Sequence, residues 1–243
     1  SAEDLVTARG AALGSGVRAS AASSSAVAYN PAALAFSRVY HIEAFSGYEP
    51  DQGRWTLGTT VVDSATNRLA AGLSFRAIMG DGEQGYSGWD GRIVLGLPLS
   101  DAVAIGLGGR YLSLTRDGQG DGGGDTLADN FTLDAALTIA PVEGLRLAAL
   151  GNNLLATETP LAPTLVGGSA SYVFAEVLTL GADVLVDLST FDTEEVIAGG
   201  GVEFLATGQI PLRLGYSYDA GRERHVLTGG IGYVEQHVGV DLS

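Results

Sequence analysis

The sequence predicts an all-β fold, an antiparallel transmembrane β-barrel. Three observations predict it: apolar residues alternate with small or polar ones, short and long connections alternate, and no helical span occurs. The stretch 177–189 shows the alternation best. Leu180 and Val184 fall on one face and Asp183 on the other. Because side chains of a strand point alternately to its two faces, this pattern gives a ribbon with one apolar and one polar face. A bilayer accepts such ribbons when every backbone group is paired in a closed sheet.

Composition agrees with a membrane protein. The chain has 243 residues, of which 36 are glycine and 17% are charged. Glycine is thus used at roughly twice its average frequency, and charged residues fall below the usual quarter. No apolar run approaches the ~18 residues that a membrane helix needs. We therefore expect two parts, an N-terminal plug over residues 1–37 and a barrel over residues 38–243, in a bacterial outer membrane.

Charge and cysteine content exclude several classes of function. The formal net charge is −15, and all 13 basic residues are arginines. Nucleic acid is therefore not expected as a partner, because phosphate binding needs clustered Lys and Arg. The absence of cysteine excludes disulfides, thiolate chemistry and cysteine metal sites. The first residues, Ser1 to Asp4, are typical of a mature N-terminus left after signal-peptide cleavage.

Thirteen segments satisfy the alternation, and turns separate them. They are 38–47, 54–63, 68–79, 86–98, 102–116, 129–140, 144–154, 164–174, 177–189, 194–205, 209–219, 224–234 and 236–243. Single-chain bacterial barrels close with even numbers of strands, so about fourteen are expected. Either a fourteenth strand is absent from this sequence, or one of the thirteen lies outside the wall. We favour the first interpretation.

The connections and the aromatic residues indicate an orientation. Short turns, expected at the periplasmic end, are 98–101, 141–144 and 175–176, whereas 117–129 and 155–163 are longer and expected outside. Tyr172 and Phe204 then lie at one rim, and Tyr86, Trp89 and Tyr111 at the other, as aromatic belts require. A soluble β-sandwich also alternates, but it would carry charges on its exposed faces, which here are apolar.

Residues 3–37 do not alternate. Asn30 followed by Pro31 predicts a helix start, with Asn30 as the cap and a short helix from Ala32 to Phe36. A segment of such small residues fits inside a narrow barrel or across its mouth.

Two stretches of this segment resemble the N-terminal signature of the FadL-like family of outer-membrane fatty-acid and hydrocarbon transporters. They read ARGAALGSG from Ala8 and SSAVAYNPAAL from Ser24. The resemblance implies a fourteen-stranded barrel in which the Asn-Pro-Ala segment is part of a plug. PorV-like barrels, which serve a protein-secretion system, carry a similar block and imply a scaffold instead. The outer loops here are shorter than those usual in the transporters.

The candidate functional residues lie in the plug and on the polar faces of the strands. For the plug and its gating they are Asn30, Pro31, Ala32 and Phe36, and for the lumen lining Phe45, Arg76, Arg92, Arg110, Asp183, Asp187 and Glu203. Arginines dominate the first seven strands and carboxylates the ninth to eleventh, with exceptions such as Asp90. Two interpretations stay open: these charges pair across a filled lumen, or they line a polar pathway.

We expect the barrel to pass hydrophobic or amphipathic, fatty-acid-like molecules across the outer membrane, with residues 1–37 as a movable plug. The alternative is a scaffold or adaptor that binds another envelope or secretion protein without transport. Outer-membrane lipid is an expected partner in both cases. Glycines on lumen faces, such as Gly106 and Gly201, suit a kink where strands separate.

No cofactor, metal site or enzymatic activity is expected. The G-x-S-x-G and H-E-x-x-H sequences are absent, and the three histidines are isolated from one another. The spacing of aspartates in the acidic loop 117–129 matches no EF-hand loop, so a solvated loop is expected, with an ion site as the alternative.

Overall fold

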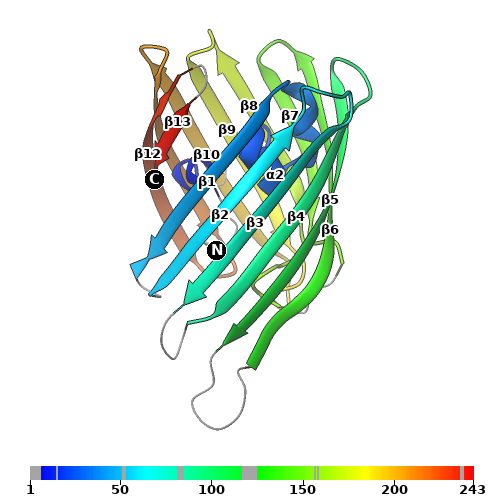
Figure 1. Ribbon diagram of the computed structural model, residues 1–243, viewed down its shortest axis with the longest axis vertical. Helices are drawn as coiled ribbons and strands as arrows, with labels where there is room; N and C mark the ends of the chain where they lie inside the picture. The colour runs from blue at the N-terminus through cyan, green and yellow to red at the C-terminus, as the bar shows by residue number, and fades with distance from the viewer. Residues whose placement is uncertain are drawn as a thin grey trace.

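The computed structural model describes residues 7–14, 16–50, 53–80, 85–116, 125–155, 157, 159–235 and 238–243. Its thirteen strands form one sheet in chain order, and each strand pairs antiparallel with its neighbours in the chain. The sheet curves around the helices of the N-terminal segment (Figure 1). The interpretation that one predicted strand lies outside the wall is therefore wrong, because all thirteen belong to this sheet. The predicted fold class is confirmed.

The strand boundaries lie close to the predicted ones. They are β1 (Tyr40–Glu49), β2 (Arg54–Asp63), β3 (Ala70–Gly80), β4 (Ser87–Pro98), β5 (Val103–Arg116), β6 (Asp125–Val142), β7 (Leu145–Asn152), β8 (Leu165–Phe174), β9 (Leu178–Asp187), β10 (Glu195–Ala206), β11 (Ile210–Asp219), β12 (Arg224–Val234) and β13 (Gly239–Leu242). The largest differences are at β6, which begins four residues before its predicted start, and at β13, which is shorter than predicted. Residues 125–129 of the predicted acidic loop are thus strand. Residues 117–124 lie outside the described part of the chain.

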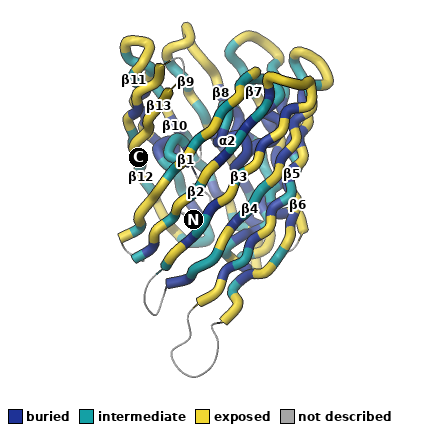
Figure 2. The backbone as a smooth tube through the Cα atoms, viewed as in Figure 1, coloured by how far each residue is buried: buried dark blue, intermediate teal, exposed yellow. Residues whose placement is uncertain are grey.

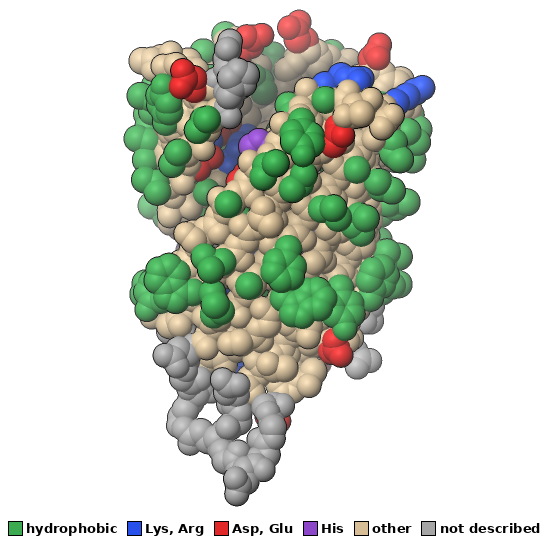
Figure 3. Space-filling model, in the orientation of Figure 1, with side chains coloured by type: hydrophobic (Ala, Val, Ile, Leu, Met, Phe, Trp, Pro, Cys, Tyr) green, Lys and Arg blue, Asp and Glu red, His purple; other side chains and the backbone are tan. Residues whose placement is uncertain are grey.

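The exterior of the sheet is apolar. Leu73, Ile93 and Leu107 are exposed, whereas Val94 and Asp134 on the opposite face are buried. Exposed and buried residues alternate along the strands in Figure 2, and on the face shown in Figure 3 hydrophobic side chains protrude in patches, several of them in a band across the barrel. This exposure is costly in water and favourable in lipid, so the soluble sandwich is excluded.

None of the helices in the described part of the chain has the length and apolar character needed to cross a membrane.

The N-terminal segment contains α1 (Ala8–Ala12), α2 (Ser23–Tyr29) and the 3₁₀ helix η2 (Pro31–Phe36). The sequence predicted η2 but missed α1 and α2. Helix α1 begins where the Thr7 hydroxyl oxygen accepts a hydrogen bond from the Gly10 N–H, at 3.0 Å. Asn30 is the N-cap residue of η2, as predicted, but its side chain makes no capping hydrogen bond. Its amide instead donates to the Arg18 carbonyl oxygen and to Thr138 on β6, each at 3.0 Å.

Glycines in the wall let the backbone of this segment approach the sheet. A Cβ added at Gly106 on β5 would lie 2.2 Å from the Ala32 nitrogen, and one at Gly201 on β10 would lie 2.8 Å from the Leu13 oxygen. The strands stay paired on both sides at these positions, so the strand separation expected there is not found. The glycines instead make room for the segment, whose residues Ala32 and Leu34 are fully buried.

Substituting Gly106 with alanine tests this packing. The new methyl group would collide with the backbone of η2, so we expect a loss of stability of about 1–3 kcal/mol, typical of overpacking. Urea unfolding of the full chain in detergent micelles measures the change. Gly47→Ala is the matched control, because a Cβ at Gly47 would meet no atom within 4 Å. Equal urea concentrations at the unfolding midpoint for the two variants would contradict the packing role of Gly106.

Candidate functional site

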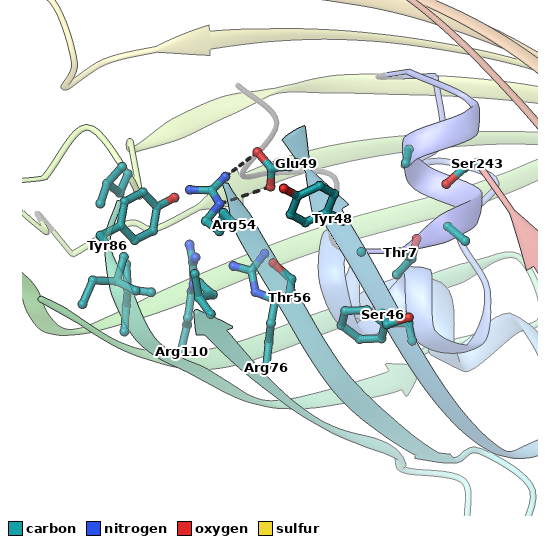
Figure 4. Close-up of a pocket in the computed structure, with 18 residues that line it drawn as sticks. Thr7, Ser46, Tyr48, Glu49, Arg54, Thr56, Arg76, Tyr86, Arg110 and Ser243 are labelled. Carbon is teal, nitrogen blue, oxygen red and sulfur yellow. Dashed lines mark hydrogen bonds and ion pairs between the residues drawn. The ribbon is translucent and has the colours of Figure 1, made fainter. Parts of the chain in front are cut away.

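Two cavities lie at opposite ends of the interior. The loop-side cavity, about 290 Å³, lies toward the ends that carry the longer loops; Figure 4 shows its lining. The turn-side cavity, about 550 Å³, lies beside the short turns after β4 and β6. Both touch α1: Ala8 and Ala11 line the loop-side cavity, and Arg9 lines the turn-side cavity. Helix α1 therefore borders both cavities.

A buried cluster of charges adjoins the loop-side cavity. Asp90 on β4 accepts hydrogen bonds from Arg76 on β3, at 2.8 Å, and from Arg110 on β5, at 2.7 Å. The Nε atom of Arg92 lies 3.5 Å from the other Asp90 oxygen, and its Nη1 atom lies 4.0 Å from Asp134. One carboxylate is thus shared by three guanidinium groups.

The strand register explains why Asp90 is needed. Arg76 is the direct cross-strand neighbour of Asp90. Arg92 is the direct neighbour of Arg110, so that two like charges face each other inside the barrel. Such a pair is destabilising by itself. A carboxylate two residues away on β4, within reach of both arginines, offsets the repulsion.

A second ion pair lies at the same cavity. The Arg54 guanidinium donates two hydrogen bonds to Glu49, at 3.2 and 2.6 Å, and lies 4.5 Å from the centre of the Tyr86 ring. Tyr86 was predicted in an outer aromatic belt, and this is wrong, because its side chain is only 7% exposed and lies inside. The reason is the alternation of faces along the chain. Residue 86 is an even number of positions from Asp90 and shares its inward face, whereas Trp89 points outward. Figure 4 shows Tyr86 beside Arg54.

The N-terminal segment is fastened to the wall by two further groups of charges. Arg18 pairs with Asp183 on β9 at 3.0 Å, and both side chains are nearly inaccessible. Arg9 donates to Glu203 on β10 at 3.0 Å. Glu203 also accepts from Arg213, its cross-strand neighbour on β11. These carboxylates therefore pair with the N-terminal segment and with their own wall, and not with the arginines of β3 to β5.

The other predicted residues occupy distinct places. Phe36 lines the turn-side cavity, where the Arg146 guanidinium lies 5.3 Å from its ring centre. Phe45 lines the loop-side cavity. Asp187 is buried at the end of β9 and accepts from the Ser189 and Thr190 N–H groups of the following loop. Pro31 and Ala32 pack against Gly96 and Gly106.

Sequence reasoning missed Arg9 and Arg18 as functional candidates. Each stands alone among small, uncharged residues of the N-terminal segment. An isolated arginine within a stretch predicted to be buried was the available signal, because a buried charge needs a partner.

Among the described residues, no group of three His, Asp or Glu side chains is placed to hold a metal ion. His41 contacts Glu43 at 3.3 Å, and the Ser24 hydroxyl donates to the same carboxylate. His225 contacts the Tyr216 hydroxyl. These contacts do not assemble a serine–histidine nucleophile. His237 lies outside the described residues.

The curved antiparallel sheet, its apolar exterior and its occupied, charged interior define the class as an integral outer-membrane β-barrel. Several solved structures share this fold, among them a toluene transporter and a porin. The toluene transporter TbuX of Ralstonia pickettii matches with a TM-score of 0.64 and 15% identity over 95% of this chain and 92% of its own. The KdgM porin matches with a TM-score of 0.52 and 11% identity over 80% and 97%. No family model matches the sequence. No curated protein matches it either.

The buried pair between Arg18 and Asp183 gives a stability prediction. Asp183→Ala leaves the Arg18 charge in the interior without its carboxylate, so we expect a loss of about 3–5 kcal/mol. Asp192→Ala, in the exposed loop after β9, is the control and should change stability by less than about 0.5 kcal/mol. Urea unfolding in micelles measures both variants. A small effect at Asp183 would show that the pair does not hold the segment.

Proposed function

We propose that this protein is a FadL-like transport barrel that passes hydrophobic or amphipathic small molecules across the outer membrane. In this proposal residues 1–37 are the plug. The observation that carries it is the pair of cavities on either side of α1. In this proposal a ligand moves past α1 from the loop-side cavity to the turn-side cavity.

The contacts of the segment favour α1 as its moving part. Helix η2 is anchored by buried contacts of Asn30, Pro31 and Ala32 with the wall. The ion pair that holds α1 is more accessible, with 19% of the Arg9 side chain and 17% of the Glu203 side chain exposed. An accessible pair is easier to break than a buried one, because water solvates both charges as they separate.

The comparisons support passage of a small molecule without naming the cargo. Two structures that share the fold are named as a toluene transporter and as a porin. The FadL-like resemblance itself rests on the two matching stretches of the N-terminal segment. A scaffold role would need no connection between the two cavities, so a test of α1 movement separates the two functions.

A disulfide that fixes α1 tests the proposal. The Cβ of Leu13 lies 3.0 Å from the position of a Cβ at Gly201. Disulfide-linked Cβ atoms are about 3.5–4.5 Å apart, so a small backbone shift admits the bond in a Leu13→Cys/Gly201→Cys variant. Because the chain has no cysteine, this bond would be the only one. Uptake of radiolabelled octanoate and toluene by Gram-negative cells producing the oxidised variant should fall to the rate of cells without the protein.

Dithiothreitol should restore uptake by the double variant. The single Gly201→Cys variant controls for the substitution in the wall and should respond neither to oxidant nor to reductant. Undiminished uptake through the oxidised barrel would contradict a gating role of α1. A stoichiometric protein bound to the purified barrel, together with absence of uptake, would favour the scaffold.

A further inference from the structure

We propose that the turn-side cavity binds a phosphate group, held by the guanidinium groups of Arg146 and Arg9. The inference goes beyond the proposed function, because it concerns the other end of the interior and a ligand that is not the hydrophobic cargo. Three observations carry it: the uncompensated charge of Arg146, the second guanidinium in the same cavity, and the access that a ligand has to both.

Arg146 on β7 differs from the other buried and half-buried arginines of the strands. Each of those has a carboxylate oxygen within 3.5 Å; they are Arg54, Arg76, Arg92, Arg110 and Arg213. Arg146 forms no ion pair or hydrogen bond with a described residue, and its guanidinium lies 5.3 Å from the ring centre of Phe36 instead. A charge that is partly removed from water without a partner is costly, so an anion is favoured beside it.

The strand register explains why the wall supplies no carboxylate here. The direct neighbour of Arg146 on β8 is Ser171, which carries no charge. On the other side, the pairing of β6 with β7 shifts between Ile139 and Val142, and no β6 residue stands directly opposite Arg146. The sheet therefore leaves the charge of Arg146 open to a partner in the cavity.

Arg9 brings a second guanidinium group into the same cavity from α1. Its carboxylate partner, Glu203, is shared with Arg213. The side chain of Arg9 is 19% exposed, and Arg146 is half-buried, so a ligand in the cavity reaches both. An anion bound here also competes with Glu203 for Arg9, which connects the site to the contact that holds α1.

This lining suits a phosphate group better than a carboxylate. A carboxylate presents two oxygens in one plane, which match the fork of a single arginine. A tetrahedral phosphate presents acceptors in several directions and can receive hydrogen bonds from guanidinium groups on two separate elements. The half-buried Thr179 on β9 adds a hydroxyl group to the lining. The volume of about 550 Å³ leaves room for either an inorganic ion or a small phosphate ester.

Two carboxylates also line the cavity, Asp101 and Glu143. Both lie in the short turns and are exposed. Neither forms an ion pair with Arg146 among the described residues. Because water solvates these carboxylates and salt screens them over about 10 Å at 0.1 M, they weaken the attraction for an anion without cancelling it.

Calorimetric titration of the folded full chain in maltoside micelles tests the inference, with inorganic phosphate, glycerol 3-phosphate and acetate as probes. We expect both phosphates to bind at least about tenfold more tightly than acetate, the scale of one additional charge-assisted hydrogen bond. Phosphate should also raise the urea concentration at the unfolding midpoint, because a ligand that binds the folded state stabilises it.

Two substitutions should move the phosphate affinity in opposite directions. Arg146→Gln should weaken phosphate at least about tenfold and abolish its effect on the unfolding midpoint. Glu203→Gln should strengthen phosphate, because it removes the acceptor that competes for Arg9. Arg68→Gln is the matched control and should have no effect: Arg68 is exposed at the same end of the barrel and donates to the Pro98 carbonyl oxygen. The heat-dependent gel shift of folded barrels checks that each variant is folded.

Unchanged phosphate affinity in Arg146→Gln would overturn the inference, and so would acetate binding as tight as phosphate binding. Tighter binding of inorganic phosphate or of the ester would identify the free ion or a phosphate ester as the ligand, and either result supports the site. Should Arg146→Gln not fold, weaker or unchanged phosphate binding by Glu203→Gln would overturn it. If neither phosphate binds, this inference fails alone, because the uptake test with the α1 disulfide does not depend on this site.

Discussion

The structure depends on the need to compensate charges that a narrow barrel encloses. The exterior faces lipid, so the charged side chains of the strands turn inward, where desolvation makes an unpaired charge costly. The compensation is local. Asp90 serves the arginines of β3 to β5, and Asp183 and Glu203 serve the arginines of the N-terminal segment. The second set of pairs fixes where that segment lies, and with it the division of the interior into two cavities.

Most of the wall was predictable from the sequence because its physics is periodic. A residue that faces lipid has to be apolar, whereas the next residue along the strand can be polar. The alternation in the sequence therefore shows which face of each strand is lipid-facing and how long the strand is. The N-terminal helices carry no such signal. In the stretch around Ser24, almost every side chain is small and all sides are buried, so no apolar stripe marks a helix. The Asn30-Pro31 pair was the only sequence signal that predicted a helix in this segment.

The pairing of the charges was harder to predict, because partners follow from register and curvature. The contact of Arg76 with Asp90 is a cross-strand pair within one hairpin, and knowledge of the β3–β4 turn would have been enough to find it. The contact of Arg18 with Asp183 joins residues 165 positions apart. It depends on how the barrel closes around the segment, and strand patterns contain no information on that.

The length of β6 has a consequence for how the protein meets its surroundings. A strand needs about 9–11 residues to cross a bilayer, and β6 has 18. With its partner β5, of 14 residues, it forms the hairpin that extends beyond its neighbours at the loop-bearing end in Figure 1. The two strands are therefore longer than a crossing of the bilayer requires, and their last residue pairs lie at this end. They form a stiff, hydrogen-bonded projection at the loop-bearing end of the barrel.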